Sequence, residues 1–166
     1  MITQSFKVVS CKDDKREVEL LDGKTAIIFS RVHANHEITT WRKKYAYLLY
    51  LPDFTQKNIE TVARTIVKKA WCDAIIDVDM MPKKNSSIQY TSLLDHGLVK
   101  ECATKNVSVF VSLQSIQDSQ AHESYIMRVL QSKKLCTKYK VPHSVVNISE
   151  NHINDADLLS FSHLLK

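Results

Sequence analysis

Residues 92–113 read SLLDHGLVKECATKNVSVFVSL and decide the fold, because they join an amphipathic helix directly to an apolar strand. Ser92 can cap the helix, and the side chain of Asp95, three residues later, can bond back to the Ser92 backbone N–H, which completes a reciprocal capping box. Three apolar residues then recur at every fourth position, on one helix face: Leu94, Leu98 and Cys102. Residues 107–113 place only serines between apolar side chains, a pattern typical of a parallel strand covered on both faces.

Further apolar runs alternate with amphipathic segments on both sides of this stretch. Strands are predicted at Phe6–Val9, Thr25–Phe29, Tyr45–Leu51, Ala74–Val78 and Ser144–Ile148. Helices are predicted from Ile59 to Ala70 behind an Asp53 or Thr55 cap, from His122 to Tyr139, and after Asn154 or Asp155. Lys12–Glu19 is interpreted as a brief helix or a loop, and Met80–Tyr90 as a loop.

Alternation of strands and helices predicts right-handed crossovers and a parallel α/β sheet of about six strands with outer helices. The 166 residues, 44% of them apolar, are enough for one domain with a substantial core, spanning residues 1–166. A complete eight-fold barrel usually needs roughly 200 residues or more. The sequence therefore predicts one α/β domain that is too short for such a barrel.

Charge and cysteine content limit the partners and the compartment. The formal net charge of +5 favours an anionic partner such as RNA, although charge alone says nothing about the fold. The four cysteines lack CxxC spacing, and neither a signal peptide nor a long apolar span is evident. We therefore expect reduced thiols, a cytoplasmic location and no membrane contact.

Catalytic motifs are scarce in this sequence. The chain has only two glycines, Gly23 and Gly97, so neither of the nucleotide-binding motifs GxGxxG and GxxxxGK(S/T) can occur in it. His33 and His36 form an HxxH pair without the further ligands that a metal site needs, so they are interpreted as a surface loop pair. Asp77 and Asp79 follow a strand, where parallel α/β proteins keep catalytic groups, but no partner base or metal ligand is evident and catalysis is not predicted there.

Basic residues are the more informative candidates. Asp95 is interpreted as a helix cap, whereas His96 either anchors the preceding loop or contacts RNA or a partner. Lysine and arginine side chains bind phosphates without reading sequence, and the usual alternative is a solvated helix face. The candidate RNA- or partner-binding residues are His96, Lys83, Lys84, Arg128, Lys134, Lys138 and Lys140.

The stretch quoted first resembles the signature segment of the Rpp30 family, the p30 protein subunit of archaeal and eukaryotic ribonuclease P. The matching positions are Asp95, His96, Asn106, Val107, Ser112 and Leu113. Other segments resemble the family in the same order along the chain: KTAIIFS (24–30), YAYLLYL (45–51), CDAIIDV (72–78), KYKVP (138–142), NIS (147–149) and ADLL (156–159).

The resemblance implies a shortened TIM-barrel-like fold related to the polymerase-and-histidinol-phosphatase (PHP) metallohydrolases, without their metal ligands. It implies a non-catalytic subunit that binds no cofactor itself and works with a Pop5-like protein and other ribonuclease P proteins. The ribonuclease P RNA then cleaves precursor tRNA at its 5′ end and requires Mg²⁺. Arg128 and Lys134 match basic positions of the family's late helix.

Three departures from the family pattern bear on these expectations. The chain aligns from the family's second strand onward, which leaves open whether its sheet closes without a partner. Gln114-Ser115 stands where the family has Arg-Pro, and Glu123 where it has Arg, so RNA contacts near that strand end are in doubt. Two other functional classes stay open: a PHP-type metal-dependent phosphoesterase, and an α/β interaction domain without an RNA role.

Overall fold

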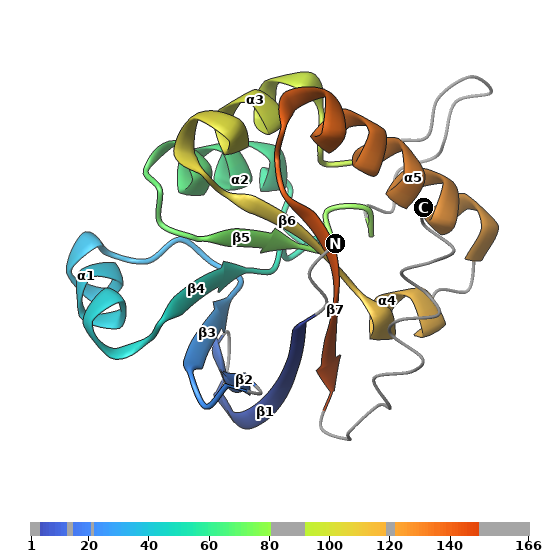
Figure 1. Ribbon diagram of the computed structural model, residues 1–166. Helices are drawn as coiled ribbons and strands as arrows, with labels where there is room; N and C mark the ends of the chain where they lie inside the picture. Colours follow the sequence, from blue (N-terminus) through green and yellow to red (C-terminus); the bar gives the residue numbers. More distant parts are fainter. Residues whose placement is uncertain (1–3, 13–14, 21, 81–91, 119–121, 150–166) are drawn as a thin grey trace.

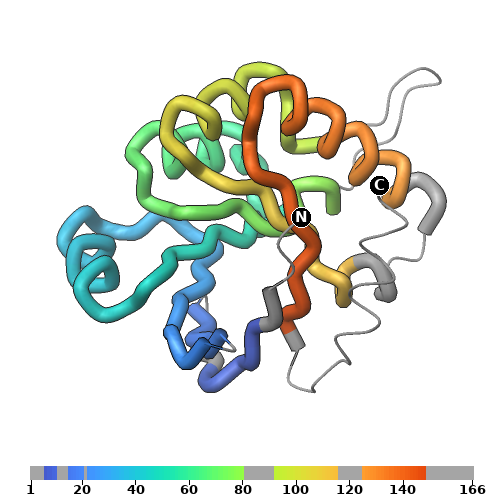
Figure 2. The backbone as a smooth tube through the Cα atoms, in the orientation of Figure 1, coloured from blue at the N-terminus to red at the C-terminus, as the bar shows by residue number. Residues whose placement is uncertain are grey.

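A closed barrel is the centre of the computed structural model, which describes residues 4–12, 15–20, 22–80, 92–118 and 122–149 (Figure 1). Its seven described strands follow one another round the barrel in chain order. They are β1 (Gln4–Lys12), β2 (Lys15–Leu20), β3 (Thr25–Phe29), β4 (Tyr47–Tyr50), β5 (Ala74–Ile76), β6 (Ser108–Ser112) and β7 (His143–Ser149). β1 pairs with β7 and closes the barrel within this chain (Figure 2).

The barrel is mixed, so the predicted parallel, shortened TIM-barrel-like sheet of about six strands is wrong. β3 to β7 and then β1 are parallel neighbours, whereas β2 is antiparallel to both β1 and β3. The missed strand, β2, overlaps the segment Lys12–Glu19, which was interpreted as a brief helix or a loop. Val18 and Leu20 are buried on one side of β2 while Glu19 is exposed on the other, which is the period-two pattern of a strand.

Short connections explain why β2 is antiparallel. A hairpin can join only antiparallel strands, while parallel neighbours need a longer crossover. In the turn from β2 to β3, the Leu20 N–H donates to the Lys24 carbonyl and the Gly23 N–H donates to the Leu20 carbonyl. Gly23 has φ +77°, a backbone conformation that glycine adopts without steric cost.

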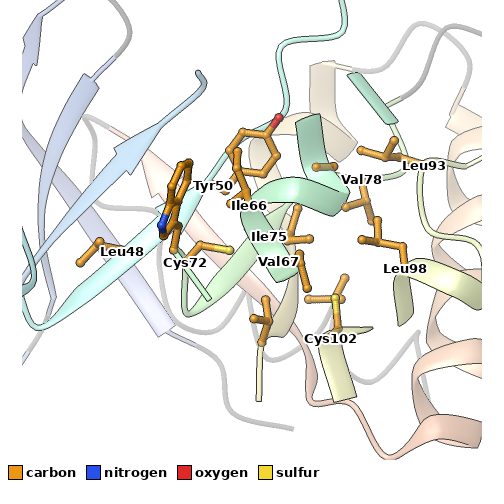
Figure 3. Close-up of a cluster of buried hydrophobic side chains, with 14 of the residues drawn as sticks. Leu48, Tyr50, Ile66, Val67, Cys72, Ile75, Val78, Leu93, Leu98 and Cys102 are labelled. Carbon is orange, nitrogen blue, oxygen red and sulfur yellow. The ribbon is translucent and has the colours of Figure 1, made fainter. Parts of the chain in front are cut away.

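Alternation along the strands builds two apolar layers. Leu49 of β4 and Ile76 of β5 lie in the cluster inside the barrel. Their neighbours Leu48, Tyr50 and Ile75 lie in the outer cluster, which the helices cover (Figure 3). Burying each such side chain contributes about 2 kcal/mol to folding, so strand order and helix placement are fixed together.

Five described helices are α1 (Asn35–Lys44), α2 (Ile59–Lys68), α3 (His96–Lys105), α4 (Leu113–Asp118) and α5 (His122–Tyr139). The prediction for α5 is confirmed, while α1 and α4 were not predicted. The N-cap of α2 is Asn58, so the predicted Asp53 or Thr55 cap is wrong. The predicted final helix after Asn154 or Asp155 lies outside the described residues.

The start of α3 was predicted in part. Asp95 is its N-cap, and the Asp95 carboxylate accepts a hydrogen bond of 2.7 Å from the Leu98 N–H. The cap interpretation of Asp95 is therefore confirmed. Ser92 lies outside the helix and is not its cap, because the Ser92 hydroxyl accepts from the Leu94 N–H and donates to the Asp79 carboxylate. None of the described helices is both long enough and apolar enough to cross a bilayer.

Candidate nucleic-acid interface

α3 and α5 pack side by side outside the barrel and bury one face each (Figure 1). Leu98, Val99 and Cys102 of α3 and Val129 and Cys136 of α5 are buried. A helix that buries one face exposes the opposite one. The exposed lysines of this region, which we call the α3–α5 lysines, are Lys100, Lys105, Lys134, Lys138 and Lys140.

The α3–α5 lysines carry charge that no described carboxylate neutralises. No ion pair with a described acidic side chain is formed by any of them. Four other lysines have such partners: Lys15 with Glu37, Lys24 with Asp22, Lys44 with Glu17 and Lys68 with Glu101. Uncompensated charge on two neighbouring helices attracts an anionic partner more strongly than neutralised pairs do.

His96, the first residue of α3, is exposed and contacts α5. Its Nδ1 lies 3.0 Å from the Tyr139 hydroxyl oxygen, and the two ring centroids are 5.8 Å apart. The Lys100 and Lys138 ammonium groups lie 5.8 and 5.7 Å from the Tyr139 ring centroid. The described contact of His96 is therefore with α5, and the structure brings His96 and Lys138 together.

The remaining predicted residues divide into three groups. Lys134 and Lys138 are exposed on α5, and Lys140 is exposed just after it. Arg128 is half-buried, and its Nη1 donates to the Asp79 carbonyl oxygen over 3.2 Å, so it ties α5 to the end of β5. Lys83 and Lys84 lie outside the described residues.

Lys100 and Tyr139 were missed, since their closeness to His96 arises only when α3 and α5 pack.

Lys140 has an unusual backbone conformation. Its φ is +58°, in the left-handed region, and Ala70 after α2 has φ +51°. Side chains with a Cβ are strained there by about 1 kcal/mol, whereas glycine is not. We predict that Lys140→Gly and Ala70→Gly each stabilise the protein by about 0.5–1 kcal/mol in urea denaturation. Only Lys140→Gly is expected to weaken RNA binding, because Ala70 carries no charge; equal RNA affinity of the two variants would contradict the assignment of Lys140.

Asp77 and Asp79 form a second polar group at the end of β5. Both are buried, with 4% and 0% of their surface exposed. Asp77 accepts from the Ser112 N–H and the Ser115 hydroxyl, each at 2.6 Å, and lies 3.5 Å from the Tyr125 hydroxyl. These contacts connect β5 to β6, α4 and α5. Ser115, a departure from the family pattern, thus has a structural contact.

Asp79 accepts from two serine hydroxyls, those of Ser92 at 2.8 Å and Ser132 at 2.5 Å. Burial raises the pKa of Asp79. Burial also raises the pKa of Asp77 to about 6, although the hydrogen bonds from Ser115 and Ser112 act to lower it. Within the described residues, no three His, Cys, Asp or Glu side chains are grouped so that they could hold a metal ion. The arrangement fits a buried tether between the strand end and the helices.

These raised pKa values predict how stability depends on pH. Between pH 3.8 and about 6 the folded protein holds a proton on Asp77 that the unfolded chain releases, so this contribution to stability falls as pH rises. The expected loss is on the order of 3 kcal/mol across that window. Urea denaturation from pH 4 to 7 measures it, and Asp77→Asn should show a flatter profile. Parallel profiles of the two proteins would refute the prediction.

The HxxH pair is split between two environments. His33 packs at the edge of the apolar core against Trp41, and the two ring centroids are 4.7 Å apart. Its Nδ1 lies 3.3 Å from Glu37 Oε2. His36 is exposed within α1. The interpretation as a surface loop pair is therefore wrong, because His33 is a packing residue at the start of α1.

Similarity to known proteins is visible in the fold. No protein-family model matches the sequence, and no curated protein matches it by sequence. A chain of the cryo-EM structure of archaeal ribonuclease P with mature tRNA has a similar fold, with a TM-score of 0.67 and 16% sequence identity. The similarity covers 84% of the present chain and 59% of that chain, so the present chain spans under two thirds of its length.

Proposed function

We propose that this chain is a protein subunit of ribonuclease P that supports RNA-catalysed 5′ maturation of precursor tRNA and breaks no bond itself. The observation that carries the proposal is the barrel that it shares with a chain of archaeal ribonuclease P over 84% of its residues. The α3–α5 lysines support it, because they are exposed cationic groups on two neighbouring helices that can contact a polyanion. The Rpp30 signature at Asp95, His96 and the end of β6 favours the p30 subunit in particular.

The physical role in this proposal is neutralisation of phosphate charge. A folded catalytic RNA brings phosphates close together, and protein ammonium groups reduce their repulsion in the way that cations do. Lys134, Lys138 and Lys140, which are exposed on α5 and just after it, are the lysines proposed for this contact. Asp77 and Asp79 are assigned no chemical role in this proposal, and their hydrogen bonds connect the end of β5 to its neighbours.

A Pop5-like protein is the proposed partner, with other ribonuclease P proteins completing the assembly. Mg²⁺ is then needed by the RNA and is not held by this chain. The supporting argument is the resemblance of the sequence to the p30 family, whose members act in such an assembly.

Reconstitution tests the proposal. The chain together with a cognate Pop5-like protein should raise precursor-tRNA cleavage by ribonuclease P RNA when Mg²⁺ is limiting. Without the RNA, the two proteins should show no cleavage. No increase in cleavage would refute the proposal, and cleavage of a phosphoester by the protein with stoichiometric Zn²⁺ or Mn²⁺ would support the metal-dependent alternative instead.

A further inference from the structure

Three side chains from α3 and α5 lie around the Tyr139 ring, and we call the four residues the Tyr139 cluster: His96, Lys100, Lys138 and Tyr139. We propose that the Tyr139 cluster binds one phosphate group of an RNA backbone, with Tyr139 as the positioning residue for His96. The inference deepens the proposed function and rests on it for the choice of RNA as the source of the phosphate.

Tyr139 lies at the centre of the cluster. It is half-buried, packs against the outer apolar cluster, and so gives the cationic groups a fixed surface. Two ammonium groups, from Lys100 on α3 and Lys138 on α5, lie within 5.8 Å of its ring centroid. Neither forms an ion pair with an acidic side chain in the described ranges, so both can donate to an added anion.

Either ring nitrogen of His96 can carry the imidazole proton, and the proposed site uses the tautomer that accepts a hydrogen bond at Nδ1. When the phenol O–H donates to Nδ1, the imidazole proton resides on Nε2, which then becomes a donor. A second partner that fixes an imidazole in this way also fixes the orientation of its ring. The cluster then offers one N–H donor beside two ammonium groups, and phosphate oxygens accept bonds from all three.

The row of charges along α5 favours a polyanion over a single acidic side chain. Lys134 lies one helical turn before Lys138, on the same helix face. Lys140 follows the helix, and neither Lys134 nor Lys140 pairs with a described carboxylate. A nucleic-acid strand repeats its phosphates at a regular spacing, so a strand bound at the Tyr139 cluster can place neighbouring phosphates near these two lysines.

The test measures binding of the isolated chain to poly(U) across a salt series. The double variant Lys100→Gln with Lys138→Gln should reduce the slope of log affinity against log salt by about 0.7, since one phosphate loses its cations. Its affinity near about 0.15 M salt should fall roughly fourfold. The matched control, Lys24→Gln with Lys44→Gln, removes two lysines that already have acidic partners and should leave the slope unchanged.

Tyr139→Phe separates positioning from charge. This variant keeps the aromatic ring and all the cations, so the salt slope should stay constant while affinity falls roughly fivefold. Nitrogen-15 NMR should show one His96 tautomer in the wild type and a mixture in the variant. Unchanged affinity together with unchanged imidazole shifts would overturn the positioning role, and an unchanged slope in the lysine double variant would overturn the site.

Two comparisons keep this inference distinct from the proposed function. Polyglutamate, tested at the same charge concentration, should bind more weakly than poly(U), and equal binding would overturn the choice of phosphate. If reconstitution fails while these poly(U) results hold, the phosphate site stands and the ribonuclease P assignment fails. If reconstitution succeeds while the variants bind like the wild type, the Tyr139 cluster is refuted alone.

Discussion

Changing Lys134, Lys138 and Lys140 together to glutamine is expected, on the proposed function, to weaken binding of ribonuclease P RNA roughly fiftyfold at about 0.15 M salt. Each lysine that neutralises one phosphate releases about 0.7 counterion, so three of them account for a loss of about 2 in the salt slope. Glutamine forms helices about as well as lysine. The stability of α5 should therefore be preserved, and a filter-binding titration over a salt series measures the loss.

A triple variant at other lysines controls for net charge. Lys15, Lys24 and Lys44 each lie within 4 Å of a carboxylate, at 3.5, 2.6 and 2.9 Å. Changing these three to glutamine removes the same formal charge but should lower RNA affinity less than threefold, about 0.7 kcal/mol. An equal loss in both triple variants would show that the total charge of the protein matters and the position of the lysines does not.

Phe29→Ala is expected to lower the free energy of unfolding by about 4 kcal/mol. Phe29 is fully buried, and its ring centroid lies 5.9, 5.6 and 5.7 Å from those of His33, Trp41 and Tyr50. Removing the ring leaves a cavity between the barrel and α1 that the packed rings around it cannot fill. Urea denaturation at neutral pH measures this loss.

Val32→Ala is the matched control for Phe29→Ala, because Val32 is nearby in sequence and 49% exposed. Its effect on stability should stay within about 0.5 kcal/mol. A loss below about 1 kcal/mol for Phe29→Ala would mean that α1 is not held by this aromatic cluster.

Strong periodicity made some elements predictable from the sequence. β3 has the predicted limits, Thr25–Phe29, because its five residues are β-branched, apolar or aromatic and four of them are buried. α5 has the predicted limits as well. The Asp95 cap was predictable because capping is a local interaction between a side chain and a backbone N–H three residues later.

Elements with few buried residues were missed. In β2 only Val18 and Leu20 are buried. The other residues are charged, so the alternation of apolar and polar side chains typical of a strand is too short to recognise in the sequence. In α1 only Ile38 and Trp41 are buried, and the remaining polar side chains gave no helical stripe. Without β2 the fold was interpreted as all parallel, and the change of strand direction was lost with it.

The candidate site was predictable only in its composition. Sequence reasoning identified His96, Lys134, Lys138 and Lys140 as basic candidates, but it could not join His96 to Tyr139, which lies 43 residues later. Such pairs depend on how two helices pack and leave no mark in local spacing. Arg128 illustrates the opposite case, since its charge suggested RNA while its described contact is with the Asp79 carbonyl oxygen.

Pairing of β1 with β7 has a consequence for biosynthesis. Gln4 is opposite Val146 and Lys7 is opposite Ser149. The barrel therefore closes only when the first described strand pairs with the last one. During translation β1 can pair early with β2, but its other edge finds β7 only after nearly the whole described chain has left the ribosome. Such long-range closure is slow because a large loop must be ordered first. A nascent chain halted before residue 143 should therefore expose the β1 edge to proteases and chaperones, and release of the full chain should protect it.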